Sequence, residues 1–197
     1  MVVQTDQLPP STELTREFVI AAHGNLKRVK EMLAANPELV NATYQWTETD
    51  SESAIQAAAQ VGSTAVVELL IEKGAPLEIC TAAMLGRYDE VRHQLDADPA
   101  KAKAVGAHEI PLMPHAVWSG NPQLVKLVYE RDAKPGEDLA LHNAILKGNL
   151  EIVRWLLENT NPDVHSRNFQ GKTPLTIARE LKAEGIIQLL TDHGASN

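Results

Sequence analysis

The sequence predicts an all-α solenoid of about six helix–turn–helix repeats, and two observations carry this prediction. The first is a recurring segment in which small or apolar residues precede a Gly, a short polar stretch and an apolar-periodic run. It occurs at residues 18–33, 56–71, 80–95, 114–129 and 142–157. The second is the spacing of three and four residues between apolar positions after each Gly, which is typical of an amphipathic helix. Recurrence every few tens of residues indicates a repeat architecture.

A glycine stands between the two helices of each predicted repeat. Glycine suits this place because it enters the left-handed region without a steric penalty. The first helix is small and apolar, so we expect it to pack between neighbours, whereas the longer, half-polar second helix should face water. The anchors are Gly24, Gly62, Gly86, Gly120 and Gly148, with Lys182 at the sixth equivalent place. We expect an N-terminal arm at residues 1–14 and a repeat domain at 15–197, with repeats starting near 15, 53, 77, 111, 139 and 173.

The last repeat makes the resemblance to a family specific. Its start, Gly-Lys-Thr-Pro-Leu-Thr-Ile-Ala at residues 171–178, resembles the Gly-x-Thr-Pro-Leu-His-x-Ala start of an ankyrin repeat. Thr173 suits a helix N-cap and Pro174 the first helical turn. In its style the sequence resembles stand-alone bacterial ankyrin-repeat proteins. The resemblance implies non-catalytic recognition of a protein or peptide partner. In that family the finger tips and the first helices form a concave binding surface.

The connections between repeats differ in length. Residues 41–52, 101–110 and 160–172 are long enough for the β-hairpin finger of an ankyrin repeat. Residues 74–78 are too few, and 132–138 are marginal. We therefore expect short or truncated fingers that leave notches in the binding edge, although ordinary drift in loop length explains the same pattern.

Composition narrows the partner class. The formal net charge of −8 disfavours nucleic acid and anionic membranes, which both require basic patches. There is no apolar run of 18 residues and no signal-peptide pattern at the N-terminus. A single cysteine, Cys80, fits a reducing compartment. Phosphate-binding glycine motifs and zinc-ligand spacings are absent from the sequence. We expect a cytoplasmic monomer that takes no cofactor and no metal.

The resemblance implies that the residue two places before each anchor points toward the partner. Those positions are Ala22, Gln60, Met84, Trp118 and Leu146. The last three fall in consecutive repeats and are predicted to form an apolar strip, since exposed apolar side chains and above all Trp act as interface anchors. The alternative is that neighbouring loops cover them.

Two fingers supply further candidate contacts. Tyr44 and Trp46 lie on the first finger, followed by the acids Glu48, Asp50 and Glu52. One interpretation is an aromatic anchor beside an acidic rim that suits a basic or amphipathic partner. The other is that both rings pack on the finger and the next repeat while the acids are solvated. His108, with Glu109, is expected at the tip of the second finger, as a contact or as an exposed residue.

A rival interpretation comes from aligning repeats three to five. Cys80, Thr81, His115, His142 and Asn143 should then cluster on adjacent first helices. They include the components of a Cys–His–Asn nucleophilic site and three possible metal ligands. Neighbouring helix axes lie about 10 Å apart, however, which is long for a direct Cys–His bond. The sequence assigns no catalytic residue, and it leaves open a small-molecule binder or atypical enzyme with a pocket near Cys80, His115, Trp118 and His142.

Overall fold

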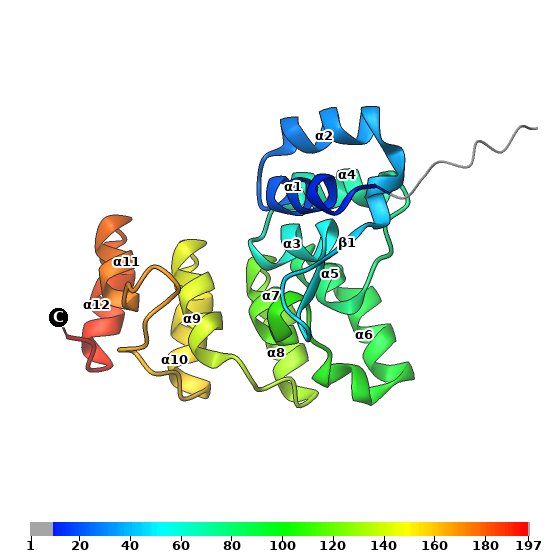
Figure 1. Cartoon of the computed structure of the whole chain (residues 1–197). Coiled ribbons are helices and arrows are strands. Elements are labelled where there is room, and N and C mark those ends of the chain that lie inside the picture. Colours follow the sequence, from blue (N-terminus) through cyan, green and yellow to red (C-terminus); the bar gives the residue numbers. More distant parts are fainter. Residues whose placement is uncertain (1–9, 197) are drawn as a thin grey trace, which may run out of the picture. The chain divides into compact units, whose positions relative to one another are not determined.

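The computed structural model describes residues 10–196, which fold almost entirely into paired α-helices (Figure 1). The predicted all-α fold is confirmed. The chain divides into two compact units, one ending at Pro76 and the other beginning at Leu77. Of the expected N-terminal arm, residues 1–9 lie outside the described residues, and Thr12 already begins the first helix. Within residues 10–196, no helix is both long and apolar enough to cross a bilayer.

The first unit contains two helix pairs joined by a finger. Its elements are α1 (Thr12–Ala22), α2 (Leu26–Ala35), the 3-10 helix η1 (Pro37–Asn41), β1 (Thr43–Gln45), β2 (Ser51–Ser53), α3 (Ala54–Gln60) and α4 (Thr64–Glu72). First helix α1 packs on α3, and second helix α2 packs on α4. Apolar side chains fill the space between them, with Phe18, Leu39, Ile55 and Leu70 fully buried.

The finger at residues 41–52 forms the β-hairpin that its length predicts. Strands β1 and β2 pair antiparallel, with Tyr44 opposite Glu52. Ser53 then begins α3 with a capping box, because its hydroxyl accepts from the Gln56 backbone while the Gln56 side chain accepts from the Ser53 backbone. The hairpin is therefore tied directly to the first turn of a first helix.

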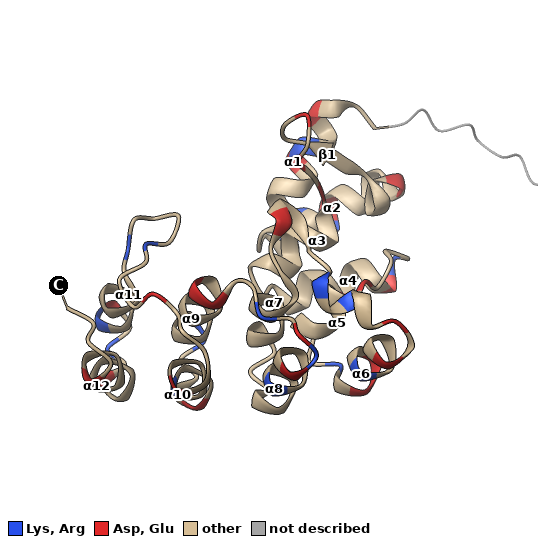
Figure 2. Cartoon of the chain, turned by 90° about the horizontal axis from the view of Figure 1, so that it is seen from below, with Lys and Arg blue, Asp and Glu red and all other residues tan. Residues whose placement is uncertain are grey.

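The second unit contains four helix pairs. Its helices are α5 (Ile79–Met84), α6 (Tyr88–Ala97), η2 (Pro99–Lys103), η3 (Ala107–Glu109), α7 (Leu112–Trp118), α8 (Pro122–Glu130), α9 (Glu137–Leu146), α10 (Leu150–Asn159), α11 (Pro174–Glu180) and α12 (Glu184–Asp192). The first helices α5, α7, α9 and α11 contact one another in chain order, as do the second helices α8, α10 and α12. Helix α7 has no Lys, Arg, Asp or Glu, whereas α8, α10 and α12 carry charged residues (Figure 2).

The connections of this unit are irregular. Residues 101–110 form 3-10 turns and one isolated bridge, between Val105 and Pro111, in place of a hairpin. Residues 160–172, all of which are described, contain turns and no strand. The marginal connection at 132–138 is also without a strand, and α9 already begins at Glu137.

Five of the six anchor positions share a left-handed backbone conformation, from which Gly24 departs with a φ of 145°. Gly24, Gly62, Gly86, Gly120 and Gly148 have positive φ, and Lys182 also adopts a φ of 54°. A lysine in this region is disfavoured by its Cβ. Its presence there matches its assignment as the sixth anchor.

Candidate functional site

The first unit places a polar cluster between the finger and the first helices. We call it the Glu52 cluster; it consists of Arg16, His23, Trp46, Glu52 and Gln60. The Glu52 side chain is 0% exposed. Its carboxylate accepts hydrogen bonds from Trp46 Nε1 at 2.8 Å and from Gln60 Nε2 at 2.6 Å. His23 Nε2 lies 3.5 Å from Glu52 Oε1 and 2.8 Å from Gln60 Nε2. The cluster links α1, the finger and α3.

Local periodicity explains this convergence. Directly paired strand residues share a face, so Glu52 projects on the same side of the hairpin as Tyr44. Trp46, two residues beyond Tyr44, follows the same alternation. Arg16 of α1 and His23, the C-cap residue of that helix, are two helical turns apart and therefore lie on one face.

The expectation that Glu52 belongs to a solvated acidic rim is wrong, because its carboxylate is buried and holds the indole N–H of Trp46. Glu48 is exposed, as expected. The rings of Tyr44 and Trp46 meet edge to face with centroids 4.7 Å apart. The Arg16 guanidinium lies 5.9 Å from the Trp46 ring centroid. Both rings are half-buried, so they pack on the finger and still present surface.

The second unit carries part of the predicted apolar strip. Trp118 and Leu146 end α7 and α9, which pack side by side. Trp118 is half-buried and Leu146 is 45% exposed. The prediction that Met84 extends this strip is wrong, since Met84 is 1% exposed and every residue of α5 is buried. Leu181, directly after α11, is 49% exposed and was not predicted.

The two candidate histidines of this unit are buried. A Cβ built on Gly106 would lie 2.6 Å from His115 Nε2, so the backbone of the preceding connection closes over that ring. His142 Nε2 lies 3.2 Å from the Ser166 hydroxyl, and burial lowers the pKa of His142. Asn143 donates from Nδ2 to the backbone oxygen of Pro114 at 3.2 Å. His142 thus contacts a residue of the following connection and Asn143 a residue of the neighbouring first helix α7.

The chemistry of Cys80 disfavours a nucleophilic site. Burial raises the pKa of its thiol to about 12, and Glu78 adds to the effect. A thiolate is the reactive form of cysteine, so this thiol stays protonated near neutral pH. Across residues 10–196, no group of three or more His, Cys, Asp and Glu side chains is placed to hold a metal ion.

Two finger residues project into solvent. His108 is exposed, and it and Glu109 have φ values of 54° and 56°. Phe169 is 93% exposed and was missed as a site residue. The Asn168 side chain accepts from the backbone N–H groups of Gln170 and Lys172, which fixes a tight turn around Phe169. The signal was present in the sequence, because an aromatic at the tip of an Asn-x-x-Gly turn has nothing to pack against.

Comparison with known proteins identifies the class. A model described as ankyrin repeats (3 copies) matches residues 79–168 and 112–197, and a single ankyrin-repeat model matches residues 50–82. These matches cover more than half of the chain, which therefore belongs to the ankyrin-repeat family.

Relatives with ankyrin repeats come from plants and a virus. Regulatory protein NPR5 of Arabidopsis thaliana is 30% identical over 135 residues, 64% of this chain and 28% of that protein. The BTB/POZ domain and ankyrin repeat-containing protein NPR1 of Malus hupehensis is 32% identical over 139 residues, 69% of this chain and 23% of that protein. Putative ankyrin repeat protein FPV014 of fowlpox virus is 27% identical over 125 residues, 60% of this chain and 28% of that protein. The chain thus spans less than a third of each relative, and a bacterial type of protein is not supported.

Proposed function

We propose that this chain is a non-catalytic scaffold that binds a protein or peptide through its first helices and finger tips. Ankyrin repeats generally mediate protein–protein interactions, and one relative is named a regulatory protein. The observation that carries the proposal is Phe169, an aromatic side chain that is 93% exposed on a turn held by Asn168. Cytoplasmic location and a monomeric state remain predictions.

The energetic argument concerns unburied apolar surface. Burying an exposed Phe side chain is favourable by about 1.5–3 kcal/mol. Because Phe169 is not buried within the described residues, a partner that covers it would gain this free energy on binding. Trp118 and Leu146 offer further apolar area on neighbouring first helices of the same unit. Aromatic side chains of this kind dominate binding energy at interfaces because they bury much area with few rotatable bonds.

The first unit offers a second set of contacts for the same function. Its finger presents the half-buried rings of Tyr44 and Trp46, with Gln60 bonded to the acid below them. Because Glu52 fixes the indole, Trp46 is held in one orientation before any partner arrives. Preorganisation of this kind lowers the entropic cost of binding.

Affinity capture tests the proposal. The immobilised full chain would be exposed to extract from the native host, and bound proteins identified by mass spectrometry. We expect Phe169→Ala and Trp118→Ala to lose proteins that the wild type retains, while helicity is unchanged by circular dichroism. Leu150→Ala is the matched control, because Leu150 is an exposed apolar residue on second helix α10. Equal capture by Phe169→Ala and the wild type contradicts the assignment.

A further inference from the structure

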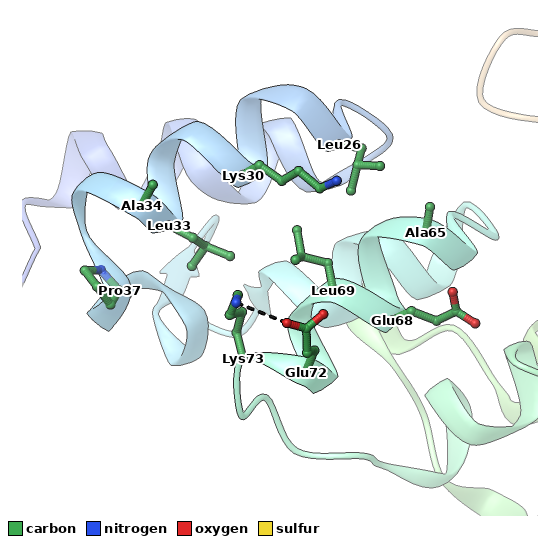
Figure 3. Close-up of a pocket in the computed structure, with 10 residues that line it drawn as sticks. All are labelled: Leu26, Lys30, Leu33, Ala34, Pro37, Ala65, Glu68, Leu69, Glu72 and Lys73. Atoms are coloured by element: carbon green, nitrogen blue, oxygen red, sulfur yellow. Dashed lines mark hydrogen bonds and ion pairs between the residues drawn. The ribbon is translucent and has the colours of Figure 1, made fainter.

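A groove runs between the second helices α2 and α4, on a different set of helices from the first-helix contacts proposed above (Figure 3). Its volume is about 870 Å³. Leu26 and Leu33 of α2 and Leu69 of α4 point into it and form an apolar floor, and Pro37 lies at one end. We call it the α2–α4 groove.

Small side chains keep this groove open. Ala34 on α2 and Ala65 on α4 line it and are exposed. In the pair α10 and α12, Glu158 stands at the place after Gly148 that Ala34 occupies after Gly24, and it forms an ion pair with Arg154 at 3.8 Å. At this register position the first unit therefore carries a small apolar side chain where the second unit carries a long charged one.

The two rims of the groove carry opposite charge. Lys30 lines the α2 side, and Glu68, Glu72 and Lys73 line the α4 side, where Glu68 is the acid that has no lysine beside it. Glu72 pairs with the adjacent Lys73 at 3.2 Å. Within residues 10–196, neither Lys30 nor Glu68 forms an ion pair, and both are exposed. An apolar floor between a basic rim and an acidic rim is complementary to a surface with the reverse arrangement.

The walls decide which backbone conformation fits. Both walls are α-helices, whose backbone N–H and C=O groups are already paired along their length. An extended peptide laid on the apolar floor would bury unpaired backbone groups, whereas a helix satisfies its own. Helix α2 has 10 residues and α4 has 9, so the groove matches about three turns of a partner helix, roughly 15 Å.

We propose that the α2–α4 groove binds an amphipathic helix of a partner protein. The apolar stripe of that helix lies on Leu26, Leu33 and Leu69. Its acidic flank faces Lys30, and its basic flank faces Glu68. This is helix-in-groove recognition, in which apolar anchors recur at i, i+3 or i+4 and i+7.

A synthetic helical peptide serves as the probe. It carries a leucine stripe at that spacing with Glu on one flank and Lys on the other; two control peptides carry only Glu or only Lys on both flanks. Titration into the isotope-labelled full chain would be followed by amide chemical shifts. We expect shifts centred on Leu26, Lys30, Leu33, Ala65 and Leu69, and weaker binding of both control peptides.

Two substitutions in the chain distinguish the effect of a side chain that blocks the groove from the effect of an added charge elsewhere on α2. Ala34→Glu should weaken the mixed-flank peptide by about tenfold or more, because a charged side chain would occupy the apolar floor. Ala35→Glu is the matched control: it adds the same charge in the same helical turn, at an exposed residue that does not line the groove. It should leave the dissociation constant unchanged.

Charge reversal tests the rims. Lys30→Glu should weaken the mixed-flank peptide by about two- to fivefold at low salt, the range expected of exposed ion pairs. Adding Glu68→Lys should restore binding, since the rims are then exchanged and the peptide helix fits in the opposite direction.

Several results would overturn the proposal. One is an absence of shifts at about 1 mM peptide, the range of the weakest specific complexes. Others are equal binding by the Ala34→Glu and Ala35→Glu variants, or shifts confined to residues of the second unit. A dimer of the chain alone that Ala34→Glu dissociates would assign the groove to a second copy. Loss of capture by Phe169→Ala tests the finger-tip contact separately and leaves this result unaffected.

Discussion

Removing the buried carboxylate of Glu52 should destabilise the first unit. In Glu52→Ala, the Trp46 indole N–H and the Gln60 amide lose an acceptor that lies within 2.8 Å of each. An unsatisfied buried donor costs about 1–3 kcal/mol, and hydrogen bonds to a charged group are at the stronger end. Both donor residues are half-buried, so water partly replaces the lost acceptor and each loss should be near 1 kcal/mol. With one methylene removed, at about 0.8 kcal/mol, we expect a total of about 2–3 kcal/mol.

Trp46 itself reports the transition. The chain has three tryptophans, so Trp118→Phe with Trp155→Phe leaves Trp46 as the only indole. In urea followed by fluorescence, Glu52→Ala should lower the midpoint by about 1 M, given a typical slope of about 1–3 kcal/mol per molar. Glu52→Gln keeps the shape and one acceptor oxygen, and it should fall between Glu52→Ala and the wild type.

A matched control and a double-mutant cycle complete this test. Glu48→Ala removes an exposed acid from the same finger and should change stability by less than about 0.5 kcal/mol. Trp46→Phe should cost about 1 kcal/mol less in the Glu52→Ala background than in the wild type, because the hydrogen bond is already absent. Equal midpoints for Glu48→Ala and Glu52→Ala, or zero coupling in the cycle, would refute the reasoning.

Three further predictions concern the second unit. Cys80, whose pKa burial raises to about 12, should react with iodoacetamide at pH 8 far more slowly in the native chain than in urea; prompt native labelling detected by mass spectrometry would contradict this. His142 has a folded-state pKa below its usual 6.5, so as pH falls the unfolded chain takes up the proton first. The free energy of unfolding should therefore fall as pH drops below about 6.5, and it should fall less steeply in His142→Asn. Urea titrations that give the same dependence on pH for the variant and the wild type would count against this. Gly106→Ala should destabilise by about 1–3 kcal/mol, since its Cβ would lie 2.6 Å from His115 Nε2; an unchanged melting temperature would show that the loop yields freely.

The repeat frame was predictable because it depends on local chemistry. Gly148 and the apolar spacing after it determine a helix end and a buried stripe within one segment. The same repeat alignment predicted that Lys182 occupies the sixth anchor position although it is not a glycine. The left-handed φ of Lys182 agrees with that prediction.

The exposure of single side chains was predictable only in part. Met84 and Leu146 hold the same place before their anchors, yet one is buried and the other is 45% exposed. The resemblance to ankyrin repeats predicts the direction in which the side chain at that position points. Its exposure also depends on which neighbouring residues pack against that side chain. The exposure of Glu52 was predicted wrongly for the same reason. An acid in a polar run of sequence is expected to be solvated, and only the folded structure shows that hydrogen-bond donors surround it. The α2–α4 groove depends on Ala34 and Ala65, which lie in different repeats and carry no local signal.

The Glu52 cluster limits how this protein can evolve. Repeat arrays change length by duplication or loss of whole units, which is tolerated when each unit offers its neighbours the same generic apolar face. Here, His23 caps the C-terminal end of α1, Glu52 comes from the finger and Gln60 from α3, so the two helix pairs of the first unit share one buried carboxylate. Deleting the first pair would remove His23 from beside the carboxylate, and deleting the second would remove the Gln60 amide that donates to it, so either loss leaves a buried negative charge with one partner fewer. We therefore expect these two repeats to be kept or lost together, as a single block of the array.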